Sequence, residues 1–167
     1  MNEKDMEQIV RGVLAGMGTA KVQPTGIQTT KSLNLKTAVA LIDKVKAQAE
    51  RMGIKVVVAV ADAAGHPVAV HCMDGAYIGS YDVAVNKAFT CAAFKMPTAT
   101  LGELAAPGGS LYGIQFTNGG KIVVFGGGDP LYMNDVLIGA IGVSGGSAEQ
   151  DIELSAYGKN MLKEVIS

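Results

Sequence analysis

The first 18 residues carry apolar side chains at intervals of three and four, the spacing that places them on one face of a helix. Acidic residues crowd the start of this segment, where they suit the helix dipole, and Gly16 and Gly18 are expected to end the helix. The apolar stripe consists of Met6, Ile9, Val10, Val13, Leu14 and Met17. Residues 19–32 are rich in threonine and contain a proline and a glycine, a composition typical of a linker.

A helix this short is not stable alone in water, so the segment over residues 1–18 is expected to dock on another surface. Its own domain and the groove of a partner both remain open as docking sites. A membrane surface is disfavoured, because the polar face of the helix mixes acidic and basic residues instead of being basic.

From residue 33 to residue 167 the pattern predicts one domain. Helical spacing covers residues 35–49, 80–94 and the stretch that starts at Ser147, while β-branched apolar runs predict strands over 54–62, 67–73, 121–125 and 136–144. Residues 97–119 are expected to form a long loop, and residues 126–135 to connect the last two strands. This order of elements predicts an antiparallel β-sheet packed with helices, an α+β fold.

Local signals fix the ends of these helices. Gly53 is expected to end the first of them, and Met96-Pro97 the second, because the residue before a proline avoids helical geometry. S-A-E-Q at residues 147–150 is a capping box, which predicts where the last helix begins.

The composition limits the class of protein. Of the 167 residues, 49% are hydrophobic and 17% are charged, which argues against an intrinsically disordered chain. A net charge of −1 without a dense run of lysine and arginine gives no footprint for nucleic acid. No apolar run reaches the ~20 residues that a membrane-spanning helix needs, and the two cysteines fit a reducing compartment, so we expect a cytoplasmic protein.

Two glycine-rich stretches invite catalytic interpretations that the sequence does not support. GVSGG, residues 142–146, matches the nucleophile elbow of serine hydrolases, but their histidine follows the serine, and here no histidine follows residue 71. FGGGDP, residues 125–130, lacks the lysine and the following helix of a phosphate-binding loop. The turn before the last helix could hold an anion, although Glu149 and Asp151 in its first turn would repel a phosphate.

VAVHCMDGA, residues 68–76, places His71 beside Cys72 at the end of a predicted strand. A structural zinc site would need about four ligands at recognisable spacing, and only His66, His71, Cys72 and Cys91 are available. A Cys–His nucleophile pair is excluded, because neighbours on a strand point to opposite faces. A haem site stays open, since one axial ligand suffices, and so does a structural pair with one residue facing the core.

Four stretches, taken in order, resemble the GlcG/HbpS family of haem-binding proteins, and in particular the C-terminal domain of PduO-type proteins. They are VAVADAAGHPVAVHCMDGA, VAVNKAFTCAAFKMPT, PGGSLYGIQFTNGGKIVVFGGGDPL and IGAIGVSGGSAEQD. The resemblance covers residues 33–160 and implies a GlcG-like, profilin-like fold, assembly into homo-oligomers and haem binding near subunit surfaces.

The resemblance also bears on how haem would be held. His66 and His71 are the best axial candidates by their chemistry, with Cys72 behind them. Lys87, in NKAFT, matches the family's Lys-Ala-x-Thr element and could meet a propionate, the alternative being a snorkelling surface lysine. Many members have an arginine where this chain has Cys72, so a weakly acidic thiol here replaces a fixed positive charge.

PduO-type proteins belong to bacterial microcompartment systems, whose packaged enzymes often carry a short amphipathic helix and a linker at one end. By this resemblance, residues 1–18 look like an encapsulation peptide that binds shell or cargo proteins in the microcompartment lumen. The chain is therefore expected to be oligomeric haem-binding cargo that supports cofactor redox or storage, without a catalytic activity of its own. The alternatives are a corrinoid-binding accessory protein of cobalamin metabolism and a cofactor-free oligomerisation module.

Overall fold

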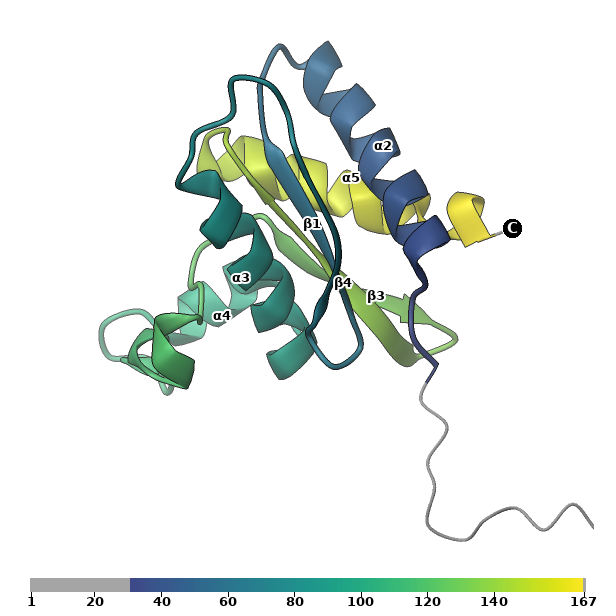
Figure 1. The fold of residues 1–167 in the computed structure, drawn as a ribbon. Coiled ribbons are helices and arrows are strands. Elements are labelled where there is room, and N and C mark those ends of the chain that lie inside the picture. Colours follow the sequence, from purple (N-terminus) through teal and green to yellow (C-terminus); the bar gives the residue numbers. More distant parts are fainter. Residues whose placement is uncertain (1–30, 167) are drawn as a thin grey trace, which may run out of the picture.

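The computed structural model describes residues 31–166, which form one sheet with helices on both faces (Figure 1). The predicted helix over residues 1–18 and nearly all of the linker lie outside the described residues and stay predictions. None of the helices between residues 31 and 166 is long and apolar enough to cross a membrane.

Within this range, four antiparallel strands pair in the order β2-β1-β4-β3, so β2 and β3 are the edges of the sheet. The predicted α+β architecture is therefore confirmed. The strands are β1 (Val57–Asp62), β2 (Pro67–Cys72), β3 (Gly128–Met133) and β4 (Val136–Ser144). The helices are α2 (Leu35–Arg51), α3 (Ser80–Phe94), α4 (Thr98–Leu104) and α5 (Ala148–Ile166), with short 3-10 turns at Ile114–Phe116 and Asn118–Gly120.

Helices α2 and α5 cover one face of the sheet, and α3 covers the other (Figure 1). Strand β1 shows how the sequence supports both layers. Val58 and Val60 belong to the core beneath α2 and α5, whereas Val57 and Ala59 pack toward α3. Because both faces are covered, the strand is apolar at every position before its last residue, Asp62, and does not alternate with polar residues.

The face beneath α3 is lined by small residues, so this helix lies very close to the sheet. A Cβ atom on Gly142 of β4 would lie 2.1 Å from the carbonyl oxygen of Ala84 and 2.7 Å from the backbone nitrogen of Ala88. Any side chain at Gly142 would therefore push α3 away. The close contact brings Lys87, which lies between these two alanines in the sequence, against the end of β4.

The predicted strand over residues 121–125 is wrong. Ile122 and Val123 are buried, but the N–H of Val123 donates to the side chain of Thr90 on α3 (3.1 Å) and not to a strand. The edge strand is instead β3, in the segment predicted to be a connection. Pro130 is tolerated there because the outer side of an edge strand needs no donor.

The β3–β4 hairpin turns at Asn134-Asp135, and both residues have positive φ angles (49° and 62°). Such values are typical of the tight two-residue turns that match the twist of the strands. Helix α4 was also missed, since residues 97–119 were expected to be a loop. It has only seven residues and no side-chain cap, so the sequence carries little signal for it.

The helix ends follow the local signals. The hydroxyl of Ser147 accepts from the N–H of Gln150 (3.3 Å), and the Gln150 side chain accepts from the N–H of Ser147 (2.8 Å). This reciprocal pair is the predicted capping box. Helix α2 ends at Arg51, and Gly53 follows with the positive φ of 71° that suits glycine after a helix.

Candidate functional site

Edge strand β2 carries two of the predicted ligand residues at its end. His71 pairs with Val58 of β1, and Cys72 pairs with Val57. Val58 and Val57 belong to cores on opposite faces, so the side chains of His71 and Cys72 also point to opposite sides of the sheet. This geometry agrees with the expectation that the two cannot act as a nucleophile and its base.

Two polar side chains from α2 surround the ring of His71. Its Nδ1 lies 3.3 Å from Lys46 Nζ and 3.8 Å from Asp43 Oδ1. An ammonium group only donates, so Nδ1 accepts here and the proton of the neutral ring sits on Nε2. Metal binding through Nε2 would need the other tautomer, in which Nδ1–H donates to the Asp43 carboxylate. The side chain is 34% exposed and is reachable from solvent.

A shallow hollow of about 250 Å³ lies beside the end of β2. Its lining residues are Lys46, Glu50, Lys55, Cys72, Met73 and Asp74. The volume of this hollow is below the roughly 300–1,000 Å³ of pockets that enclose a small-molecule ligand. A large flat ligand would therefore lie across this surface, where Lys46 and Lys55 offer ammonium groups to anionic substituents.

His66 lies at the other end of β2, in the turn after β1. Its side chain is 79% exposed, with Nδ1 at 3.5 Å from Asp62 Oδ2. The other oxygen of Asp62 accepts from the N–H groups of Ala64 (2.9 Å) and His66 (2.8 Å), which closes the turn. His66 and His71 are five positions apart, about 16 Å at the usual rise of a strand, so the two cannot bind the same iron within one chain.

The side chain of Lys87 has no exposed surface, and that of its partner Asp151 is only 6% exposed. Lys87 Nζ donates to Asp151 Oδ2 (2.8 Å) and to the carbonyl oxygen of Val143 (2.7 Å), and it lies 4.9 Å from the centre of the Phe125 ring. The alternative of a snorkelling surface lysine is therefore wrong. A direct contact between Lys87 and a propionate would first require this pair to open.

The ion pair of Lys87 and Asp151 is tightly packed by its neighbours. A Cβ atom on Gly127 would lie 2.6 Å from Lys87 Nζ and 2.7 Å from the Cβ of Asp151. Asp151 Oδ1 also accepts from the N–H of Gly146 (3.0 Å). Burial lowers the pKa of Lys87 from its ordinary value, because it disfavours the charged form more than the nearby Asp151 favours it.

The glycine turn before α5 is structural. Ser144, the serine of the G-x-S-x-G motif, is buried and donates to the hydroxyl of Ser80 (3.2 Å). Asp151 Oδ1 accepts from the N–H of Gly146. This donor is therefore not available to an anion at the start of α5.

Among residues 31–166, no group of three or more histidine, cysteine, aspartate or glutamate side chains could hold a metal ion. Haem iron does not need such a group, since one protein ligand suffices. The structure brings His71 and Cys72 to one strand end, but it places His66 at the opposite end and Lys87 inside the fold.

Sequence reasoning missed Asp43 and Lys46 as neighbours of His71, and Asp151 as the partner of Lys87. No sequence signal indicates which face of α2 lies over His71. The burial of Lys87, by contrast, had a signal: it lies three residues after Ala84 and four before Cys91, on the face of α3 that is buried.

The family model described as haem-degrading protein HbpS-like matches residues 33–159. An uncharacterized 15.0 kDa protein from the dhaT-dhaS intergenic region of Citrobacter freundii is 40% identical over 138 residues, which are 83% of this chain and 97% of that protein. The corrinoid adenosyltransferase PduO of Salmonella typhimurium is 39% identical over 108 residues, 65% of this chain but only 32% of that protein. A crystal structure of a complex of PduOC with haem has 34% identity and a TM-score of 0.74, covering 77% of this chain and 94% of that one.

Removing the charge of Lys87 should destabilise the fold strongly. Lys87→Met leaves Asp151 buried without its partner, and we expect the free energy of unfolding to fall by about 3–5 kcal/mol in urea denaturation. Lys159→Met is the matched control, because Lys159 pairs with Asp129 (3.4 Å) from a side chain that is 46% exposed. The control should cost less than about 1 kcal/mol. Equal losses in the two variants would contradict a stabilising role for the Lys87 pair.

The two cysteines should differ in reactivity. Cys72 is exposed, whereas burial raises the pKa of Cys91 to about 12, so Cys91 stays a protonated thiol at ordinary pH. A thiol titration with Ellman's reagent at pH 8 should count one thiol per native chain and two after unfolding in guanidinium. Cys72→Ser should leave no reactive thiol in the native protein. Two rapidly reacting thiols in the native wild type would be the opposite result.

Proposed function

This chain belongs to the HbpS-like family of haem-degrading proteins, and from that premise we propose that it binds haem beside the outer edge of its sheet, next to His71. The observation that carries the proposal is the similarity to PduOC, which was crystallised as a complex with haem and is 34% identical across 94% of its length. A relative this similar shares the fold, and the ligand is carried over to this chain only where its own site residues support it.

The end of β2 offers a better ligand for iron than any other described surface. His71 offers an imidazole that solvent can reach, on an edge strand with no neighbour on its outer side. Histidine is a common axial ligand of haem iron. Asp43 Oδ1 lies 3.8 Å from Nδ1, and a small approach would let it accept the Nδ1 proton once Nε2 faces a metal, which would fix the ring and raise its basicity.

The propionates of haem need cationic or hydrogen-bonding partners. Lys55 lines the hollow beside the end of β2 and can supply one, and so can Lys46 once it leaves Asp43, to which it donates (2.9 Å). These lysines stand in for the arginine that many family members have at position 72. Lys87 is not proposed as a propionate partner, because its ammonium group is buried in the pair with Asp151 at the end of β4.

We also propose that the protein assembles into homo-oligomers. The turn before α3 exposes Tyr77 and Ile78, the latter at 97% of its surface, and Tyr112 and Phe116 are exposed in the segment after α4. Large exposed apolar side chains such as these are candidates for a protein–protein contact. A second copy lying over the ligand surface would cover a haem that the 250 Å³ hollow cannot enclose.

Residues 1–18 are proposed to be an encapsulation peptide that directs the chain into a microcompartment. Support comes from the similarity to PduO and from the apolar stripe of the segment, which suits a helix-in-groove contact. Inside the compartment, bound haem would serve redox support or storage of a cofactor. A corrinoid is the second candidate ligand, because PduO is named for its action on corrinoids, although this chain spans only about a third of it.

The first test is a haemin titration of the purified apo-protein, followed through the Soret band. Wild type should bind saturably with about one haem per one or two chains, and His71→Ala should weaken binding at least tenfold and shift the Soret maximum. His66→Ala is the matched control, since it removes the same side chain from the other end of β2. Asp43→Asn should weaken binding less than His71→Ala, because it removes only the acceptor for Nδ1–H.

The outcomes separate the alternatives. Unchanged affinity and spectrum in both His71→Ala and Cys72→Ala would remove the proposed site, and loss of binding in His66→Ala would move it to the turn after β1. If only Cys72→Ala alters the spectrum, the thiolate is the ligand. A saturable response to cobalamin with none to haemin would favour the corrinoid function.

Packaging has a separate test. Deleting residues 1–18 should abolish co-purification of the chain with microcompartment shells and leave haemin binding unchanged, because the family domain starts at residue 33. Shell-associated protein would be measured by immunoblotting of purified compartments. Co-purification of the shortened chain at the level of the full chain would show that residues 1–18 are not the signal.

A further inference from the structure

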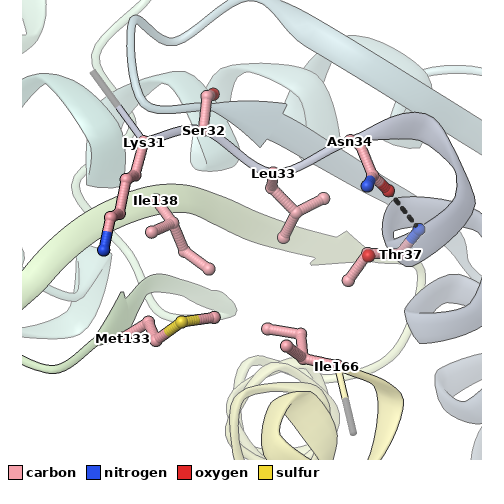
Figure 2. Close-up of a pocket in the computed structure, with 8 residues that line it drawn as sticks. All are labelled: Lys31, Ser32, Leu33, Asn34, Thr37, Met133, Ile138 and Ile166. Atoms are coloured by element: carbon pink, nitrogen blue, oxygen red, sulfur yellow. Dashed lines mark hydrogen bonds between the residues drawn. The ribbon is translucent and has the colours of Figure 1, made fainter. Parts of the chain in front are cut away.

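An apolar groove lies at the end of the molecule where the described chain begins (Figure 2). It consists of two hollows of about 290 and 320 Å³ that share Met133 and Ile166. Figure 2 shows the side chains of Leu33, Ile138, Met133 and Ile166 pointing into the first hollow. They come from the stretch before α2, from β4, from β3 and from α5. Leu162 of α5 and Tyr132 of β3 line the second. None of the apolar surface in this groove belongs to the proposed haem site.

Exposed apolar side chains also neighbour the lining residues. Ile166 itself is 38% exposed. Leu35, which follows Asn34 in the chain, and Val136, which pairs with Met133, are 60% and 44% exposed. The polar side chain of Asn34 is already used as the cap of α2, where it accepts from the N–H of Thr37 (2.9 Å). The groove therefore combines apolar side chains with a polar margin, a surface suited to an amphipathic helix.

The chain itself supplies such a helix close by. Lys31 lines the groove, so the 30 residues that precede it leave from its edge. The apolar stripe of residues 6–17 would extend about 18 Å as a helix. Residues 18–30 connect the stripe to the groove and can span up to about 45 Å when extended, which is enough for the stripe to fold back along the groove.

Tethering favours this intramolecular contact over contact with another molecule. A short tether of this length gives an effective concentration of about millimolar, so a weak contact is sufficient to keep the groove occupied. Charge is complementary as well. Lys31 and Lys163 flank the two hollows, and the helix starts with Glu3, Asp5 and Glu7.

We infer that residues 6–17 dock as a helix in the groove of their own chain, between Leu33, Met133 and Ile166. The same apolar stripe would bind a shell protein, so docking and packaging exclude each other. A shell protein must displace the segment from its own groove before capture. This inference does not depend on haem binding, and it holds for the free chain whether or not the segment is a packaging signal.

Hydrogen–deuterium exchange of the full chain, read by mass spectrometry of peptides from residues 1–18, tests the docking. We expect exchange at least tenfold slower than for an unstructured chain, because an isolated helix of this length is barely protected. Ile166→Asp should remove this protection. Ile152→Asp is the matched control, since Ile152 lies on the same helix, is 40% exposed and is about 21 Å from Ile166 along the axis.

A reciprocal variant covers the case in which Ile166→Asp disturbs the end of α5. Leu14→Asp changes only the segment, and it should speed exchange in peptides from the β3–β4 hairpin at least threefold. Docking in the same chain is overturned if residues 6–17 exchange like an unstructured chain, or if Ile152→Asp removes protection as fully as Ile166→Asp. Protection that falls on tenfold dilution also overturns it, because the occupant would then be a second copy.

Failure of this inference and failure of the packaging proposal are distinguishable. Exchange is measured on the free chain without shells, whereas packaging is measured with shells present. A chain whose segment is unprotected but still required for co-purification would keep the packaging proposal and remove the docking.

Discussion

The buried ion pair of Lys87 and Asp151 is the constraint on which the arrangement of the layers depends. It joins α3, on one face of the sheet, to the first turn of α5 beside the other face, with the carbonyl oxygen of Val143 at the end of β4 between them. A lysine reaches these acceptors only because Gly142 lets α3 lie against the strand and Gly127 leaves room above the ammonium group. The glycines and the ion pair depend on each other. The glycines allow the close approach that pairs the two charges, and a buried charge without its partner would be costly in free energy.

The proposed ligand site at the end of β2 differs from the buried Lys87 pair, because it is open to solvent. His71 and Cys72 lie on an edge strand beside a shallow hollow, so the chain offers ligand atoms and cations but little shelter. Shelter for a large planar cofactor would have to come from another molecule. In the proposed oligomer a second copy would provide this shelter, through contacts with the exposed aromatic residues around the start of α3.

Much of the fold could be predicted from the sequence, because β1 and β4 are continuous apolar runs and the three long helices have helical spacing and clear end signals. Strand β3 could not, since Gly128 and Pro130 resemble a turn, and its pairing depends on the neighbouring β4. The opposite orientation of His71 and Cys72 follows from strand geometry alone. The proximity of Asp43 to His71 does not, because it depends on how α2 is rotated over the sheet.

The two edges of the sheet are not equivalent. Pro130 lies in the middle of β3 and has no N–H to give to an added strand, whereas β2 has proline only at its first residue. Strand addition is therefore favoured past β2 and disfavoured past β3. A contact that uses the same edge on both partners is self-complementary and closes at two copies, so this sheet is protected against growth into an open fibre.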